Sequence, residues 1–243
     1  MTSNTGIADR LQSVRNRIAS AAQRVGRSPE TVRLVAVGKT KPAALIQEAF
    51  ESGQVHFGEN YVQELVDKAR QLPESLRWHF IGHLQTNKAR SLLSVPNVWC
   101  VESVDRAKVA STLNRLVGEL RGPDSRLNVM VQVNTSGEAN KAGVSPEQAP
   151  ELARYIATEC PALHLLGLMT IGAPDDSDEP AAFRLLRETR ERVQAVLEQE
   201  ASAAVARPLE LSMGMSDDFE AAVRMGSTNV RVGSVIFGAR VYH

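Results

Sequence analysis

Lys39 stands where an apolar strand is expected to end, and this position changes the chemistry of its amine. Residues 34–37 form a short apolar run with β-branched residues at alternate positions, which predicts a strand buried on both faces. By strand alternation Lys39 shares a face with Val35 and Val37, so its amine is partly desolvated. Desolvation lowers the pKa of a lysine and makes it a better nucleophile toward a carbonyl. The alternative is a lysine whose stem follows the apolar surface while its amine reaches water.

Small residues gather at the ends of the last two expected strands, where a phosphate group could bind. Ser212 and Ser216 belong to one strand end and its loop, Gly233 and Ser234 follow the next strand, and Arg231 lies between the two groups. Loops of this kind direct backbone N–H groups and helix N-termini toward phosphates. The alternative is that the glycines form turns and the serines cap helices. A strand-end lysine opposite a phosphate site indicates a phosphorylated aldehyde held as a Schiff base. Pyridoxal 5′-phosphate (PLP) is the commonest cofactor with these two groups.

Eight strand–helix units position these residues. Strands are expected at residues 34–37, 55–58, 78–82, 98–101, 127–133, 163–171, 209–213 and 229–232. Helices are expected at residues 7–25, 42–53, 61–72, 87–94, 105–120, 145–159, 179–201 and 217–225, with a closing segment at 234–239. Asp105, Ser145 and either Thr40 or Lys41 are the expected helix caps.

This alternation predicts an α/β fold, a single (β/α)8 TIM barrel with an extra N-terminal helix, forming one domain over residues 1–243. The alternative is an open, doubly wound sheet. No G-x-G-x-x-G sequence follows an early strand, which counts against that alternative. In a barrel, sites form at the carboxyl ends of the strands, where Lys39 and the two small-residue loops fall.

The composition excludes several other classes of protein. Lys plus Arg total 28 and Asp plus Glu total 28, so no net field favours nucleic acid or an anionic membrane. No apolar run is long enough to span a membrane, and residues 1–7 lack the apolar core of a signal peptide. Cys100 and Cys160 are too few for a disulfide framework or a structural zinc site. We therefore expect a cytoplasmic protein with reduced thiols.

Six segments share their sequence with a known family: VAVGKTKP, FGENYVQE, WHFIGHLQTNK, QVNTSGEANKAG, GLMTI and LSMGMSDDFEAAVRMGSTNVRVGSVIFG. From about Leu34 to the end, the chain resembles the PLP homeostasis protein family, also called the PROSC or YggS family. The resemblance implies the barrel of the PLP domain of alanine racemase (PLP fold type III). It also implies that Lys39 binds PLP and that the protein buffers PLP and supplies it to apo-enzymes.

The resemblance further implies which residues surround the cofactor. The expected set is Lys39, Asn60, Ile81, Ser212, Met213, Ser216, Arg231, Gly233 and Ser234. Within it, the serines and Gly233 would hold the phosphate, Arg231 would face the pyridine nitrogen, and the other side chains would line the ring. The matching segments leave open which of Ser212 and Ser216 contacts the phosphate.

The charge of Arg231 favours a carrier of PLP over an enzyme. A guanidinium can only donate hydrogen bonds, so it holds the pyridine nitrogen unprotonated and weakens PLP as an electron sink. Alanine racemase compensates with a tyrosine from a second domain, and we expect no such domain in these 243 residues. The alternatives are a low-activity PLP-dependent racemase or related enzyme, and a cofactor-free Schiff-base aldolase. We expect a monomer whose candidate partners are apo PLP-dependent enzymes.

Other residues also have reactive side chains, but each has a simpler structural interpretation. His79 and His83 lie four apart, but no carboxylate or cysteine is expected near them, so we predict no metal site. His83 remains a candidate for contact with PLP. Lys41 is expected to face solvent at a helix entry. Lys141, in the loop after the fifth strand, could take part in PLP entry or transfer, or could be a solvated loop lysine.

Overall fold

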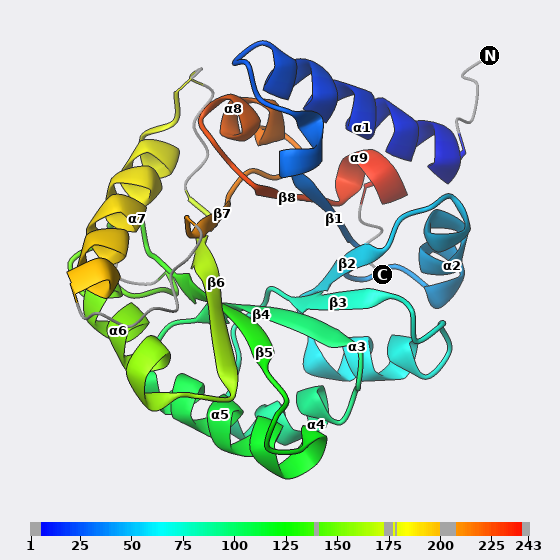
Figure 1. Ribbon diagram of the computed structural model, residues 1–243. Coiled ribbons are helices and arrows are strands. Elements are labelled where there is room, and N and C mark those ends of the chain that lie inside the picture. The colour runs from blue at the N-terminus through cyan, green and yellow to red at the C-terminus, as the bar shows by residue number, and fades with distance from the viewer. Residues whose placement is uncertain (1–5, 139–140, 173–176, 178, 200–207, 240–243) are drawn as a thin grey trace.

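Eight parallel strands form a closed barrel with helices around it (Figure 1). The computed structural model describes residues 6–138, 141–172, 177, 179–199 and 208–239. The strands are β1 (Arg33–Val37), β2 (His56–Glu59), β3 (Arg77–Phe80), β4 (Val98–Val104), β5 (Leu127–Gln132), β6 (Leu163–Met169), β7 (Glu210–Ser212) and β8 (Asn229–Val232). The helices are α1 (Ile7–Gln23), α2 (Ala43–Glu51), α3 (Val62–Ala69), α4 (Ala89–Leu93), α5 (Ala107–Arg121), α6 (Ala149–Glu159), α7 (Ala181–Gln199), α8 (Phe219–Arg224) and α9 (Ser234–Phe237). Two 3-10 turns, Pro29–Thr31 and Thr86–Lys88, complete the described elements.

The strands pair in sequence order, and β8 returns to pair with β1. Arg33 lies opposite Asn229, and Ala36 lies opposite Val232. This closure confirms the predicted (β/α)8 barrel over the open sheet, because an open sheet would leave two strand edges unpaired. The extra N-terminal helix is also confirmed. The predicted end of the long helix, near residue 201, lies outside the described residues.

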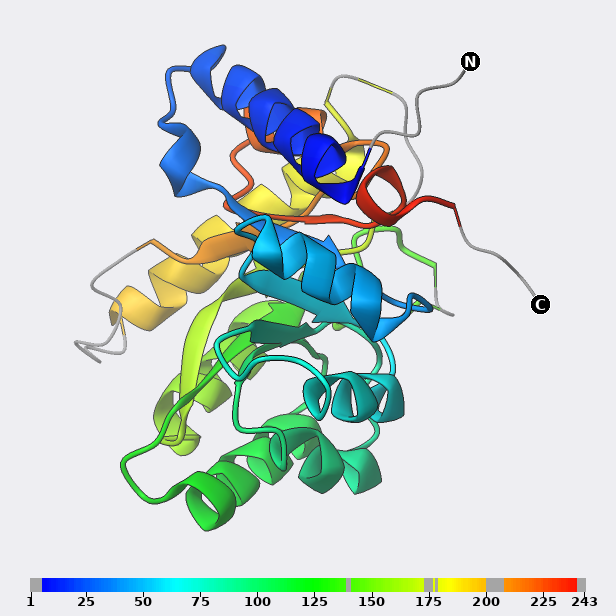
Figure 2. The same cartoon turned by 90° about the vertical axis from the view of Figure 1, so that its right-hand side faces the viewer.

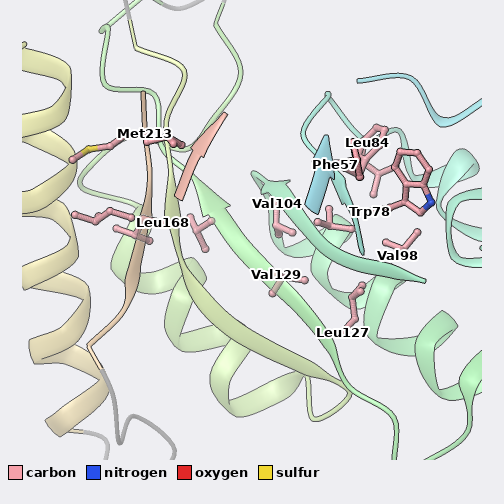
Figure 3. Close-up of a cluster of buried hydrophobic side chains, with 14 of the residues drawn as sticks. Phe57, Trp78, Leu84, Val98, Val104, Leu127, Val129, Leu168 and Met213 are labelled. Carbon is pink, nitrogen blue, oxygen red and sulfur yellow. The ribbon is translucent and has the colours of Figure 1, made fainter. Parts of the chain in front are cut away.

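Strand alternation divides the core into a barrel interior and an outer shell. Val35 and Val37 are buried in the interior, where a Cβ added to Gly58 would meet both side chains and Ile81. The outer shell lies between strands and helices and includes Phe57 against Trp78, with ring centroids 6.1 Å apart (Figure 3). Removing such area from water stabilises the fold by roughly 25 cal/mol per Å². Because the outer shell buries most of the apolar side chains, the barrel interior can contain polar side chains without losing most of the hydrophobic stabilisation.

Helix α1 covers the barrel beside its closing strands. Its apolar stripe, including Leu11, Val14 and Ile18, is buried. The helix packs against α8, α9 and α2, as Figures 1 and 2 show. It thus joins the beginning of the chain to the elements that follow β7 and β8. No helix among the described residues is long and apolar enough to cross a bilayer.

Two of the three expected helix caps are wrong. Pro42 precedes α2 in place of Thr40 or Lys41, and Arg106 precedes α5 in place of Asp105. Ser145 does cap the turn that leads into α6: its Oγ accepts from the Gln148 N–H and its own N–H donates to Gln148 Oε1, although the α-helix itself begins three residues later than expected. The Asp105 carboxylate does not cap α5, because the adjacent Arg106 and the more distant His83 already bind it.

Candidate functional site

Lys39 lies two residues after the end of β1, and hydrogen bonds from α3 fix the loop that contains it. Lys68 Nζ donates to the Gly38 carbonyl at 2.8 Å, and the Thr40 N–H donates to Glu64 Oε1 at 2.6 Å. Thr40 has φ 63°, a left-handed conformation that costs a residue with a Cβ roughly 1–2 kcal/mol. The surrounding bonds therefore hold a sharp turn immediately after Lys39.

Lys39 faces a cavity of about 280 Å³ at the carboxyl ends of the strands. This volume is near the lower end of the range for small-molecule sites, about 300–1,000 Å³. The lining residues are Val37, Lys39, Lys41, Asn60, Ile81, Ile171, Met215, Ser216, Asp217, Arg231, Gly233, Ser234 and Gly238. One cavity thus brings together an amine, a buried guanidinium and two hydroxyls from opposite parts of the chain.

Most residues of the expected cofactor set line this cavity: Lys39, Asn60, Ile81, Ser216, Arg231, Gly233 and Ser234. Ser212 and Met213 are not among the lining residues. Ser212 is fully buried in the barrel interior, where its hydroxyl contacts Arg231. Met213 lies in the outer shell and points toward α7 (Figure 3). Neighbouring residues of one strand face opposite sides, which separates these two side chains.

Arg231 is fixed at the cavity by two hydrogen bonds. Its Nη1 donates to Ser212 Oγ at 2.6 Å, and its Nη2 donates to the Thr170 carbonyl at 2.7 Å. Burial lowers the pKa of Arg231 from its usual value, while Glu102 and Asp218 oppose this shift. Because an arginine pKa starts above 12, the guanidinium keeps its charge and acts only as a donor.

Asn60 and Glu59 lie at the end of β2 on opposite faces of the chain, and only Asn60 lines the cavity. The Asn60 Oδ1 atom is buried with no hydrogen-bond partner, a cost of roughly 1–3 kcal/mol unless a ligand supplies a donor. Asn60 is held close to β3, because a Cβ added to Gly82 would lie 1.9 Å from the Asn60 carbonyl oxygen. Burial raises the pKa of Glu59 to about 7, although the charges of Lys68 and Lys39 oppose this shift. Asn60 therefore offers an unsatisfied acceptor to the cavity, whereas Glu59 is held by Lys68 of α3 at 2.7 Å.

The expectation that His79 has no carboxylate or cysteine nearby is wrong. His79 Nδ1 lies 2.5 Å from Glu102 Oε1, and the ligand atoms of His79, Cys100 and Glu102 all lie within 4.8 Å of one another. Burial and the Glu102 carboxylate raise the pKa of the Cys100 thiol. The thiol is therefore neutral, and hydrogen bonds already engage the Glu102 oxygens. The absence of a metal site remains a prediction.

The other candidates lie around the cavity mouth. His83 does not line the cavity, and its Nδ1 lies 3.4 Å from Asp105 Oδ2. Lys41 does line the cavity, which corrects its expected place in solvent, and its Nζ donates to the Ala239 carbonyl. Lys141 pairs with Glu138 at 2.7 Å in the loop after β5.

Sequence reasoning missed several lining residues, including Val37, Ile171, Met215 and Asp217. Ile171 and Met215 are 47% and 37% exposed. In the sequence, each looks like an ordinary apolar residue of a loop. The sequence signal that could have found these residues is Gly214. Its φ of 95° turns the chain after β7 and brings the next residues to the mouth of the cavity. A Cβ there would lie 2.5 Å from the Ala222 Cβ.

His56 makes the fold sensitive to acid. Burial lowers the pKa of His56 to about 3, and positive charge on His79, Arg33 and Arg77 adds to the shift. From pH 6.5 down toward pH 3 the unfolded chain takes up a proton that the folded chain does not, so stability falls with pH. We expect the His56→Gln variant to lose less stability than the wild type between pH 7 and pH 4.5, by about 1 kcal/mol after allowing for partial exposure. Urea unfolding at each pH measures this slope. His83→Gln, whose side chain is half exposed, is the matched control and should keep the wild-type slope.

Comparisons with known proteins identify the fold and the family of this chain. Residues 10–241 match the family model described as the N-terminal domain of alanine racemase. The solved alanine racemase of Corynebacterium glutamicum superposes with a TM-score of 0.63 at 16% identity, covering 95% of this chain and 62% of that one, which shows the shared fold. The class of protein is therefore the barrel of the alanine racemase N-terminal domain.

Relatives of higher sequence identity show which family within this class the chain belongs to. The pyridoxal phosphate homeostasis protein of Escherichia coli K12 is 46% identical over 97% of both chains, and that of Bos taurus is 45% identical over all of this chain and 90% of its own. PipY of Synechococcus elongatus, solved with PLP bound, has a TM-score of 0.77 at 35% identity, over 96% of this chain and 100% of that one. The chain belongs to the pyridoxal phosphate homeostasis protein family.

Proposed function

We propose that this chain is a single domain over residues 1–243 that binds PLP as a Schiff base with Lys39 and acts in PLP homeostasis, buffering the cofactor and supplying it to apo-enzymes. The observation that carries the proposal is one cavity of about 280 Å³ lined by both Lys39 and the buried Arg231. A carbonyl-reactive amine and a fixed donor are the two groups needed to hold an aromatic aldehyde in one orientation.

The cavity residues fit the cofactor. Ser216, Gly233 and Ser234 are in place for the phosphate, while Val37 and Ile81 offer apolar surface to the ring. The unpartnered Asn60 Oδ1 supports a bound polar ligand, because such an atom otherwise stays unsatisfied. Of the two serines, we assign Ser216 to the phosphate site. We assign Ser212 to the contact with Arg231 instead, because the Ser212 hydroxyl already accepts a hydrogen bond from that guanidinium.

The same residues favour carrying PLP over turning over a substrate. Bound PLP supplies an electron sink for amino-acid chemistry, and that sink is strong only when the pyridine nitrogen is protonated. Arg231 can only donate, so it keeps a proton off an acceptor nitrogen. Of the described tyrosines, neither Tyr61 nor Tyr155 lines the cavity as a paired base. A low-activity racemase is the second candidate, favoured by the shared fold with alanine racemases.

The test is an absorption spectrum of the purified protein before and after adding an apo PLP-dependent enzyme. We expect an imine band that borohydride fixes onto the Lys39 peptide, and loss of that band as the apo-enzyme gains activity. A protein that never takes up PLP contradicts the proposal and returns the aldolase to consideration. Loss of chirality in a panel of amino acids would favour the racemase. A cytoplasmic location, a monomeric state and the absence of nucleic-acid or membrane partners remain predictions.

A further inference from the structure

The barrel interior below Arg231 contains a chain of buried polar side chains centred on Glu102. Glu102 is 0% exposed, on β4, and Arg231 is 4% exposed, on β8. Ser212 lies between them, donating from Oγ to Glu102 Oε2 at 2.5 Å and accepting from Arg231 Nη1 at 2.6 Å. Asn229 Nδ2 donates to Ser212 Oγ at 2.9 Å. The serine hydroxyl thus uses its donor and both acceptor positions, which fixes its orientation.

Glu102 is also held from its other side. His79 Nδ1 lies 2.5 Å from Glu102 Oε1, and His79 Nε2 lies 2.8 Å from His56 Nδ1. The Trp99 ring packs on both histidine rings, with centroids 4.9 Å from His79 and 5.0 Å from His56. The carboxylate therefore has donors on both oxygens and little freedom to rotate.

This arrangement does not serve packing alone. A buried carboxylate and a buried guanidinium each cost several kcal/mol to desolvate, and removing either partner leaves the other uncompensated. Arg231 uses two of its N–H groups on Ser212 and the Thr170 carbonyl, and the same residue lines the cavity. The direction in which it offers donors to a ligand thus depends on Ser212, and Ser212 depends on Glu102.

We propose that Glu102 is a positioning residue for cofactor binding: through Ser212 it is the buried counter-ion that orients Arg231 toward the cavity. Glu102 does not touch the cavity itself. This inference rests on the proposed function, because the ligand that Arg231 meets is taken to be PLP.

A double-mutant cycle in the ligand-free protein tests the charge pair without PLP. We expect Glu102→Gln to lower the Tm by roughly 10 °C, because it leaves a buried cation without its counter-ion. Adding Arg231→Gln should restore at least half of that loss, a recovery that a packing defect at Glu102 would not give. Ser103→Ala is the matched control, since Ser103 adjoins Glu102, is buried and has an Oγ atom without a hydrogen-bond partner. It should leave the Tm within a few degrees of the wild type. Additive Tm losses in the double variant would overturn the pairing.

PLP titration then tests positioning. We expect Glu102→Gln to raise the Kd for PLP about tenfold in the wild-type background and less than about twofold in the Arg231→Gln background, as expected for two residues that act through one contact. Ser103→Ala should leave the Kd unchanged. An unchanged Kd in Glu102→Gln, with the wild type binding PLP, overturns the inference while the proposed function stands. A wild type that does not bind PLP contradicts the proposed function, and the ligand-free cycle still judges the pair.

Discussion

Lys39→Ala is expected to abolish the imine band completely. Lys39 lies just after β1 and lines the cavity. Hydrogen bonds from Lys68 and Glu64 fix the turn that contains it. The neutral amine of a lysine is the nucleophile that attacks the carbonyl, and an alanine side chain offers none. Absorbance and mass spectrometry after borohydride treatment measure the loss.

Two other lysines provide controls for that experiment. Lys41 lines the same cavity, but its Nζ donates to the Ala239 carbonyl at 2.7 Å. Lys141 pairs with Glu138 in the loop after β5. We expect Lys41→Ala and Lys141→Ala to keep the band. A borohydride-fixed adduct on either of these lysines in the wild type would show that Lys39 is not the attachment point.

Pyridoxal without its phosphate is expected to bind at least a hundredfold more weakly than PLP. The cavity offers the Ser216 and Ser234 hydroxyls and the backbone of Gly233 at one end. Each charge-assisted hydrogen bond contributes roughly 1.5–3 kcal/mol, and each 1.4 kcal/mol is a tenfold change in affinity, so two lost bonds exceed a hundredfold. Titration of the two aldehydes, followed by absorbance, gives both dissociation constants.

A single substitution locates the phosphate within the cavity. Ser216 Oγ accepts the Gly233 N–H at 3.1 Å, so this hydroxyl already joins the loops after β7 and β8. Ser216→Ala should weaken PLP binding about tenfold and leave pyridoxal binding nearly unchanged. Equal losses for both aldehydes, or equal affinity of the wild type for both, would place the phosphate elsewhere.

The sequence alone determined the architecture, and it placed the strand ends to within about three residues. Eight apolar runs at regular spacing leave few alternatives to a barrel, because parallel strands need crossover helices and closure removes both sheet edges. The eighth strand, Asn229–Val232, is found with the expected bounds. Helix starts were less predictable. Asp105 has the right chemistry for a cap, but its carboxylate is bound by the adjacent Arg106 and by His83, and the contact with His83 is a tertiary one that no local pattern reveals.

For the site, the sequence placed Lys39, Arg231 and Ser216 at strand ends, and the tertiary structure decided what each of them meets. Ser212 and Ser216 look equivalent in the sequence, yet one is buried beneath Arg231 and the other lines the cavity. Glu102 carries no local signal at all. Its partner Ser212 lies 110 residues away, and the two meet only because barrel closure and strand register direct both side chains into the same interior.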